Sequence, residues 1–286
     1  MKIRLYSDLH REFDKWEIPV IENEQDYVLV LAGDIAVARK NGTYAPYLAK
    51  LADRHKAVVY VPGNHEYYGD SFDRAWEKIA CDWDWDNLHF LNDGYVDIDG
   101  VRFLGATLWT DFNLDNNQGL RMQQAAQWMN DYRVINRLLM TDEGEYRYKG
   151  KLRPQDTLHA HLGTVAFFDA ILEETPEDMK TLVVTHHGPT PQSIHEKYHG
   201  DELNAAYVSN LAELIRERAP DVWVHGHTHS TFQYYEANTL VMTNPKGYPA
   251  RAVWKGCETQ YENPDFRVDG LMPEIDEVLN GHQAET

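Results

Sequence analysis

At residues 57–66 the chain reads AVVYVPGNHE, an apolar run that passes directly into polar residues of the kind that bind metals. The first five residues are continuously apolar and rich in β-branched side chains, which is typical of a strand buried on both faces of a layered sheet. Gly63-Asn64-His65-Glu66 follows where such a strand would end. The stretch therefore predicts a buried strand whose carboxyl end carries side chains suited to chemistry.

Four other short apolar runs end in the same way. They lie at residues 3–7, 27–32, 181–185 and 222–224, and they lead into Asp8-Leu9-His10, Gly33-Asp34, His186-His187 and Gly226-His227-Thr228-His229. Helical patterns near 44–54, 71–79 and 203–218 alternate with the runs, which predicts an α/β sandwich. Ligands of an open α/β sheet gather at the carboxyl ends of its strands. We therefore expect the polar residues behind all five strands to meet at one place.

A second set of strand patterns comes without intervening helices, at residues 88–91, 95–98, 101–108, 231–236 and 239–243. These patterns predict antiparallel additions and hence two packed sheets. Residues from about 109 to 174 carry helical patterns at 118–129, 132–140 and 154–173 around a polar stretch, and they predict a helical insertion. The whole chain, 1–286, is expected to be one domain that ends in a loosely packed acidic tail from about 270 to 286.

The composition of the 286 residues excludes several classes of protein. With 43% hydrophobic and 12% aromatic residues the chain can bury a core, so disorder is excluded. No run approaches the roughly 20 apolar residues of a membrane span, and the start of the chain lacks the pattern of a secretory signal. Two cysteines, Cys81 and Cys257, make no disulfide framework, so a cytoplasmic protein is predicted. The net charge of −19 makes nucleic acid an unfavourable partner; these features do not predict an oligomeric state.

The number and type of the polar residues indicate a centre of two metal ions. They are two Asp, one Asn and four His, more than the three protein ligands of a single catalytic zinc: Asp8, His10, Asp34, Asn64, His186, His227 and His229. Imidazole, carboxylate and amide ligands suit Mn, Fe or Zn better than Ca. Asp34 can bridge two ions with its two oxygens. This would leave Asp8, His10 and His229 on one ion, and Asn64, His186 and His227 on the other.

His186 and His187 are neighbours, and adjacent side chains of a strand point in opposite directions, so only one of them should bind metal. His186 directly follows the apolar run and is the predicted ligand. His187 is expected at the rim of the centre or behind its ligands.

The five blocks Asp-x-His, Gly-Asp, Gly-Asn-His-Glu, His and Gly-His-x-His, in this order from Asp8 to His229, resemble the calcineurin-like metallophosphoesterases. The resemblance implies a two-sheet, four-layer α-β-β-α sandwich. It also implies a dinuclear metal centre that hydrolyses phosphate esters, in which a metal-bound hydroxide attacks the phosphorus.

The resemblance also implies roles for residues that bind no metal. His65 would be catalytic, protonating the leaving oxygen or stabilising the charge that develops there, although its ring could instead only hydrogen-bond Asp34 or a scaffold group. Glu66 is expected to anchor a His ring. Tyr67 could flank the leaving group or pack against the next helix. His195 and Tyr198, in a loop after the fourth apolar run, are further candidates for substrate contacts.

The predicted substrate is a small phosphomonoester or phosphodiester, because both kinds of hydrolysis use the same ligands. Two alternatives remain open. A nucleic-acid processing phosphodiesterase would need a basic groove. A non-catalytic protein-binding scaffold on the same fold would be expected to lose ligands, and here all five blocks are intact.

Overall fold

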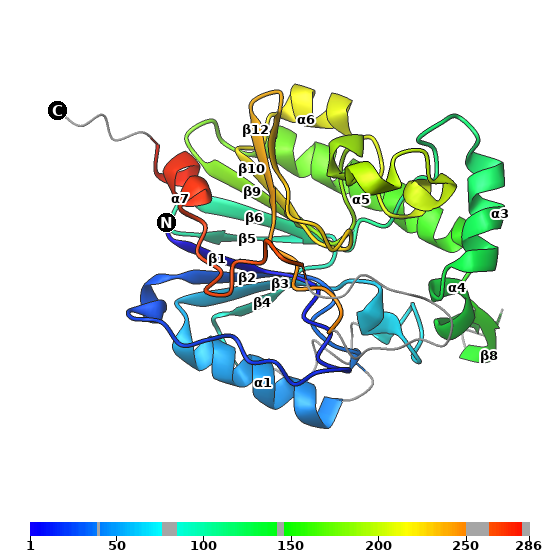
Figure 1. Cartoon of the computed structure of the whole chain (residues 1–286), viewed down its shortest axis with the longest axis horizontal. Helices are drawn as coiled ribbons and strands as arrows, with labels where there is room; N and C mark the ends of the chain where they lie inside the picture. Colours follow the sequence, from blue (N-terminus) through cyan, green and yellow to red (C-terminus); the bar gives the residue numbers. More distant parts are fainter. Residues whose placement is uncertain (39–40, 76–84, 142–145, 250–262, 282–286) are drawn as a thin grey trace.

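Two β-sheets pack face to face between helices (Figure 1), in a computed structural model that describes residues 1–38, 41–75, 85–141, 146–249 and 263–281. One buried cluster between the sheets contains Leu5 and Val59 of the first sheet and Phe103 and Val224 of the second. A second cluster lies outside the first sheet and a third outside the second sheet. The predicted four-layer α-β-β-α sandwich is therefore confirmed.

The first sheet is entirely parallel. Its order is β1 (Ile3–Tyr6), β2 (Val28–Ala32), β3 (Ala57–Val61) and β4 (Leu88–Phe90). Alternate residues of β2 enter different clusters: Val28 and Val30 face the second sheet, whereas Leu29 and Leu31 face α1 (Asn41–Arg54). Both faces of the strand are apolar, which explains why its sequence is continuously hydrophobic.

The second sheet has the order β11-β12-β10-β9-β6-β5. The strands are β5 (Gly94–Ile98), β6 (Val101–Ala106), β9 (Lys180–Thr185), β10 (Val222–His225), β11 (Gln233–Glu236) and β12 (Thr239–Thr243). Its outer face is covered by α5 (Pro154–Glu174) and α6 (Ala212–Arg218), through residues such as Phe168 and Ile215 (Figure 1).

The predicted antiparallel pairing occurs between β5 and β6 and between β11 and β12. On their other sides β6 and β12 pair in parallel with β9 and β10. The prediction is wrong for β4, which pairs in parallel with β3. The chain passes from β10 to the edge position of β11 and returns by a hairpin, so that β12 runs parallel to β10 without an intervening helix. The long segment between β6 and β9 makes the other parallel connection.

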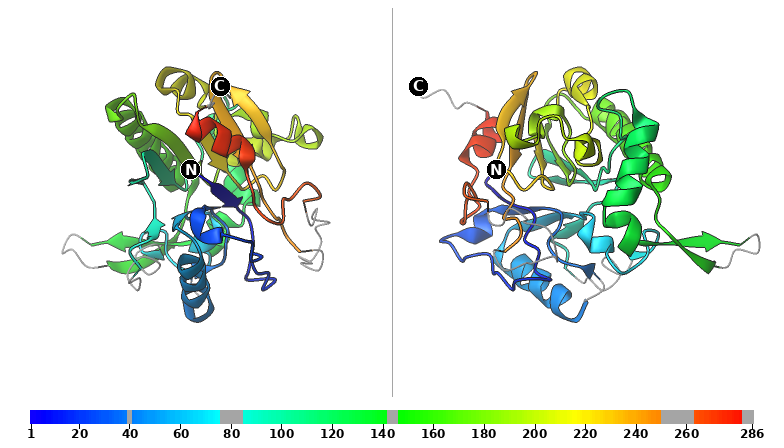
Figure 2. Two further views of the ribbon diagram at one scale, coloured as in Figure 1. Left: turned by 90° about the vertical axis from the view of Figure 1, so that its left-hand side faces the viewer. Right: turned by 45° about the vertical axis from the view of Figure 1, so that its right-hand side comes forward.

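The segment predicted as a helical insertion contains α3 (Gln118–Trp128), α4 (Asp131–Val134) and also a hairpin of β7 (Asn136–Met140) and β8 (Tyr146–Lys151). The hairpin projects from the body of the molecule (green in Figure 2, right). The helix predicted at 132–140 is therefore wrong beyond Val134, because a short apolar run fits helix and strand equally well. The last helix, α5, is part of the outer layer of the sandwich.

The loosely packed tail is also wrong for the described residues 270–281. Helix α7 (Pro273–Asn280) inserts Ile275 and Leu279 into the cluster between the sheets. Asp276 Oδ1 accepts a hydrogen bond of 2.8 Å from the backbone N–H of Ile3, so the helix is joined to β1 near the N-terminus (Figure 1). The apolar residues at 272, 275 and 279 share one helical face, a pattern that the acidic composition obscures.

Other predicted helices differ in detail. The pattern at 203–218 divides into a 3-10 helix, Glu202–Ala206, and α6. The pattern at 71–79 lies outside the described residues from residue 76 onwards, as do both cysteines. The remaining short 3-10 helices are Glu24–Asp26, His65–Tyr67, Pro191–Ser193 and Glu196–Tyr198. Within the described part of the chain, none of the helices combines the length and the apolar character needed to cross a bilayer.

Candidate metal centre

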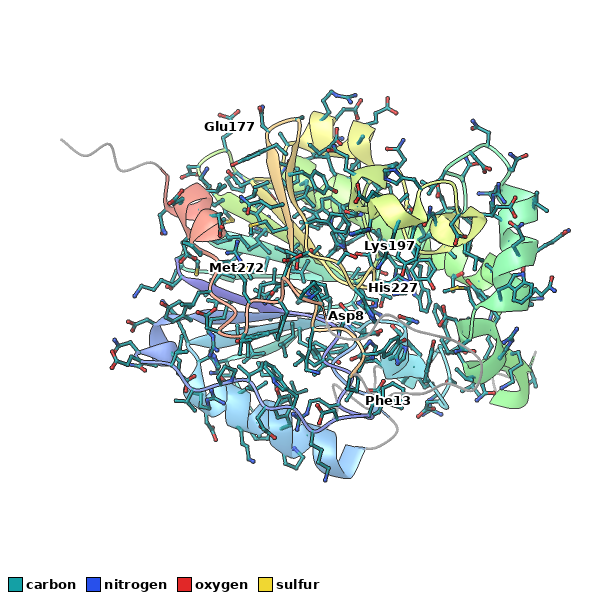
Figure 3. The ribbon with its side chains drawn as sticks, viewed as in Figure 1. Asp8, Phe13, Glu177, Lys197, His227 and Met272 are labelled. Carbon is teal, nitrogen blue, oxygen red and sulfur yellow. The ribbon has the colours of Figure 1, made fainter. Side chains whose placement is uncertain are left out.

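The polar residues that follow β1, β2, β3, β9 and β10 meet in the middle of the molecule, where Asp8 and His227 lie next to each other (Figure 3). Three sets of side chains bring potential metal-binding atoms within 4.8 Å of one another: Asp8, His10 and His229; Asp34, His186 and His227; and His10, Asp34 and His65. The predicted convergence of strand ends thus occurs, with side chains from both sheets.

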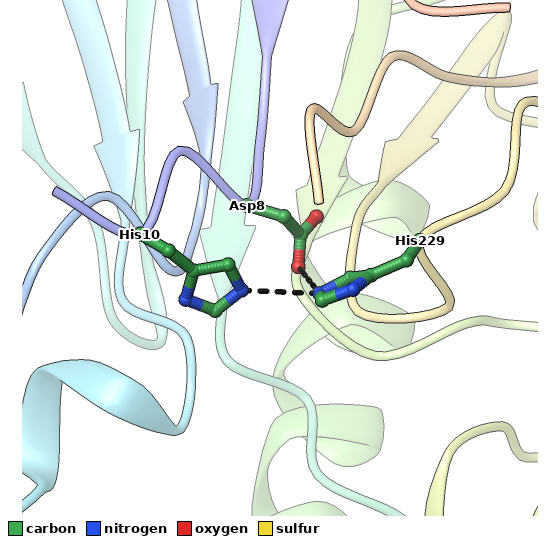
Figure 4. Close-up of side chains that lie close together, drawn as sticks. All are labelled: Asp8, His10 and His229. Carbon is green, nitrogen blue, oxygen red and sulfur yellow. Dashed lines mark hydrogen bonds and ion pairs between the residues drawn. The ribbon is translucent and has the colours of Figure 1, made fainter. Parts of the chain in front are cut away.

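The first set surrounds His229 (Figure 4). The Nε2 atom of His229 lies 3.1 Å from Nε2 of His10 and 3.2 Å from Oδ1 of Asp8. Asp8 and His10 are fully buried. Because His10 Nδ1 donates a hydrogen bond of 3.2 Å to Glu12, its Nε2 atom is left facing His229 and Asp8.

The second set surrounds His186. Its Nε2 atom lies 3.3 Å from Oδ1 of Asp34 and 3.1 Å from Oδ1 of Asn64. Its Nδ1 atom donates to the carbonyl of Ala32 at 2.9 Å, which leaves Nε2 free to bind a cation. The other carboxylate oxygen of Asp34, Oδ2, lies 3.8 Å from Nε2 of His10. Asp34 therefore directs one oxygen towards each set.

This arrangement fits a pair of metal ions. The Nε2 atoms of His10 and His229 face each other, and Nε2 of His227 is buried without a hydrogen-bond partner among the described residues. Buried polar atoms normally have partners, and a cation between the facing nitrogen and oxygen atoms would satisfy them. The absence of thiolates from the set agrees with the chemistry of Mn, Fe or Zn.

The backbone turns sharply at the predicted ligands. Left-handed φ angles occur at Asp8 (52°), His10 (45°), Asp34 (55°), His227 (67°) and His229 (50°). Such a conformation costs a non-glycine residue about 1–3 kcal/mol and is concentrated at functional sites. It allows alternate residues, such as Asp8 and His10, to reach the same centre.

Glycines let the backbone approach the ligands closely. A Cβ atom on Gly63 would lie 2.1 Å from Oδ1 of Asp34, and one on Gly226 would lie 2.6 Å from Oδ2 of Asp8. No side chain fits at these distances, so the glycines of Gly-Asn-His-Glu and Gly-His-x-His are sterically required.

His65 belongs to the third set and lies next to Asp34, whose oxygens are directed towards the first two sets. Its Nδ1 atom donates to Glu12 at 2.7 Å, and its Nε2 atom lies 3.8 Å from Asp34 Oδ2 and 3.2 Å from the hydroxyl of Tyr248. Burial opposes protonation, but the carboxylates of Asp34 and Glu12 outweigh it and raise the pKa of His65 to about 9. Of the alternatives for this residue, a direct ring hydrogen bond to Asp34 is absent, although the backbone N–H of His65 donates to Asp34 Oδ1 at 2.9 Å.

Glu66 has partners different from the predicted His ring. Its carboxylate accepts hydrogen bonds from the backbone N–H groups of Asp34 (3.0 Å), Ile35 (2.8 Å) and Gly63 (2.7 Å), and from the hydroxyl of Tyr60 (2.7 Å). Glu66 lies beneath the loops that follow β2 and β3. It therefore joins the two loops that carry Asp34 and Asn64.

His187 is buried beside the second set rather than at a rim. Its ring centre lies 4.2 Å from that of His227, and its Nδ1 atom donates to the carbonyl of Thr107 at 3.1 Å. Burial and the neighbouring His186 lower the pKa of His187 to about 3. It packs behind a predicted ligand in neutral form.

The residues predicted to contact the substrate have other partners in the structure. Tyr67 is buried and packs against Phe72 and Trp109, which matches the packing alternative. In the described structure, His195 accepts a hydrogen bond from Lys197 N, and the Tyr198 carbonyl accepts one from Asn204. Among the interactions of the described residues, neither side chain contacts a predicted metal ligand.

Several residues that contact the predicted ligands were not predicted from the sequence. Glu12 binds both His10 and His65, and its burial is outweighed by these two hydrogen bonds, which lower its pKa to about 2. Tyr248 stacks on His10 with ring centres 4.3 Å apart. Asp131 hydrogen-bonds Asn64. Only Glu12 had a local signal, the extension of Asp-x-His by a second carboxylate at the next alternate position.

Comparisons with known proteins agree with this geometry. The family model described as calcineurin-like phosphoesterase matches residues 1–231. The uncharacterized protein L509 of Acanthamoeba polyphaga mimivirus is 26% identical over 274 residues, which cover 86% of this chain and 91% of that protein. The crystal structure of phosphopantetheinyl hydrolase (PptH) from Mycobacterium tuberculosis has a TM-score of 0.64 at 17% identity, covering 86% of this chain and 89% of that one. At 17% identity, the similarity to this hydrolase shows a shared fold only.

Proposed function

Because this chain belongs to the calcineurin-like phosphoesterases, a family of phosphoester hydrolases, we propose that it hydrolyses a small phosphomonoester or phosphodiester with two metal ions. One observation carries the proposal. Asp34 directs Oδ1 towards His186 and Oδ2 towards His10, and the remaining potential ligands are divided between these two sides.

The proposed ligands form two groups that share Asp34. Asp8, His10 and His229 complete one group, and Asn64, His186 and His227 complete the other. Manganese, iron and zinc are the candidate ions, because the donors are imidazole nitrogens and carboxylate and amide oxygens. When bound, the two cations supply an activated water and neutralise charge on the phosphoryl oxygens.

His65 is proposed to act on the leaving oxygen. Glu12 accepts its Nδ1 hydrogen, which holds the ring with Nε2 towards the centre. From this position Nε2 can donate a proton to the leaving oxygen or stabilise the charge that develops on it. Tyr68 supports the ring from one side, with ring centres 4.1 Å apart.

The substrate is proposed to enter at His229. Its side chain is 19% exposed, whereas those of Asp8, His10 and His186 are fully buried. The rings of Tyr248 and Tyr207 stack on His10 and His227, with ring centres 4.3 and 4.7 Å apart. We infer that these rings restrict the space beside the metals to a small ester.

Loss of a proposed metal ligand tests the proposal. The Asp34→Ala and Asn64→Ala variants should hydrolyse p-nitrophenyl phosphate and bis(p-nitrophenyl) phosphate in manganese at least about 100-fold more slowly, since metals supply several kcal/mol of transition-state stabilisation. Glu177→Ala is a matched control, because it removes an exposed carboxylate far from Asp8 (Figure 3). Circular dichroism should show the same fold in all three. Wild-type turnover in both ligand variants would refute the proposal.

The nucleic-acid alternative has a direct test. A chain with net charge −19 is expected to leave single-stranded and double-stranded DNA and RNA uncut in a gel assay that includes manganese. Metal-dependent cleavage that disappears in Asp34→Ala would replace the small-ester proposal with the nuclease.

A further inference from the structure

Asp131 reaches the metal centre from the segment between β6 and β9. It is the first residue of α4 and is only 2% exposed. Its Oδ1 atom accepts hydrogen bonds of 2.8 Å from both Asn64 Nδ2 and the hydroxyl of Tyr68. The segment therefore touches a predicted metal ligand directly.

The contact determines which end of the Asn64 amide faces the metals. An Asn side chain ends in an acceptor oxygen and a donor NH2 group of almost the same shape, but only the oxygen binds a cation. An ionised carboxylate accepts hydrogen bonds and donates none. Asp131 therefore binds the NH2 end of Asn64, and this turns Oδ1 towards His186 Nε2, 3.1 Å away.

The position of Asp131 supports a role beyond packing. Its carboxylate is buried, and among the described residues it makes no ion pair with a lysine or arginine. Its hydrogen bonds go instead to a predicted ligand, Asn64, and to Tyr68, whose ring stacks on that of His65.

We propose that Asp131 is a positioning residue that orients Asn64, so that this segment of the chain completes one of the two metal sites. The inference rests on the proposed function only in assuming that the centre binds metals. Substitutions of outer partners of metal ligands typically cost 10–100-fold in metal affinity. We therefore expect substitution of Asp131 to lower the affinity for one ion and to leave the affinity for the other ion unchanged.

Metal binding by the full chain, after chelator treatment and titration with manganese, tests this without any assay of turnover. Isothermal titration and metal analysis should find about two ions in the wild type. Asp131→Leu, which has no acceptor, should bind one ion about 10–100-fold more weakly and the other normally. Asp131→Asn keeps an acceptor oxygen and should recover part of the loss.

Asp115→Leu is the matched control, because it makes the same change at an exposed carboxylate of this segment that binds Arg121 and no predicted ligand. It should bind both ions as the wild type does. A folded Asp131→Leu variant that binds two ions with wild-type affinities would overturn the inference. A wild type that binds no metal would instead contradict the proposed function.

A charge exchange keeps the inference testable if Asp131→Leu does not fold. Asn64→Asp places a second carboxylate at hydrogen-bond distance from that of Asp131. It should lower the affinity for one ion, although a carboxylate is ordinarily a good metal ligand. Adding Asp131→Asn restores the pair of one donor and one acceptor, because the amide at position 131 can donate to the carboxylate at position 64. The double variant should bind that ion at least about tenfold more tightly than Asn64→Asp. Equal or weaker binding by the double variant would overturn the inference.

Discussion

Glu12 holds two imidazoles of the centre through one carboxylate oxygen. Oε1 accepts from Nδ1 of His10 at 3.2 Å and from Nδ1 of His65 at 2.7 Å. Both rings are thereby turned so that Nε2 faces Asp34, at 3.8 Å in each case. A proposed metal ligand and the proposed proton donor therefore share one anchor.

Glu12→Gln should hold the two rings less firmly, because a neutral amide oxygen is a weaker acceptor than a carboxylate oxygen shared by two imidazole N–H groups. We expect kcat/KM for an aryl phosphate to fall about 10–100-fold, as for other outer partners of metal ligands. Glu17→Gln in the same loop, where Glu17 binds Arg11 at the surface, is the control and should keep wild-type turnover. Equal rates in the two variants would show that Glu12 does not support catalysis.

At the scale of elements, Glu24 joins β1 to α1. Its carboxylate accepts two hydrogen bonds from Arg54 at the end of α1, at 2.7 and 2.8 Å, and one from the buried Arg4 of β1 at 3.2 Å. The hydrogen bonds from Arg54 outweigh the opposing effect of burial and lower the pKa of Glu24 below its usual 4.5. The ionised form is therefore stabilised by folding.

This shift has a defined sign. The stabilisation is fully present above pH 4.5, the pKa of Glu24 in the unfolded chain. It is lost as the pH falls through the lower pKa that Glu24 has in the folded state. Glu24→Gln should lower the free energy of unfolding by about 3 kcal/mol at pH 7, because it removes the carboxylate that pairs with both arginines. The difference from wild type should shrink near pH 3. Urea unfolding in chelator at both pH values measures it.

The exposed Glu22 provides the control for this experiment. Glu22→Gln should differ from wild type by less than about 0.5 kcal/mol at either pH. A Glu24→Gln difference that stays constant from pH 7 to pH 3 would mean that the ionised carboxylate is not what stabilises the junction.

At the scale of the whole molecule, the proposed ligands come from both sheets. Asp8, His10, Asp34 and Asn64 follow strands of the first sheet, and His186, His227 and His229 follow strands of the second. Bound ions would therefore link the two sheets at the carboxyl ends of these strands. Helix α7 also contacts both sheets, because it packs against the core between them and against β1 and β10.

Removal of metal should consequently destabilise the molecule. We expect chelation to lower Tm and manganese to restore it, with a gain of about 2.7 kcal/mol per site when the free ion is at 100 times its Kd. Differential scanning calorimetry measures the change. The Asp34→Ala variant, which lacks the shared ligand, should respond less. An identical response in this variant would exclude Asp34 as a ligand.

The elements and the candidate ligands could be predicted because their signals are local. The apolar runs that form β1, β2, β3, β9 and β10 bury both faces, and a few neighbouring residues are enough to reveal that pattern. The polar residues behind these runs were recognisable by type and order. Hydrophobic patterning thus predicted where strands end, and the ends of parallel strands lie at one edge of a sheet.

Tertiary structure decided the features that depend on residues far apart in the chain. The direction of β6 and β12, the choice of strand over helix at 136–140 and the docking of α7 depend on partners up to hundreds of residues away. The same is true of Asp131, which meets Asn64 across 67 positions. The sequence by itself determined the layers and the chemical types at the centre, because burial and residue identity are local properties. Only the folded chain decided which hydrogen bonds orient each side chain, because a hydrogen bond requires its two partners to be in place.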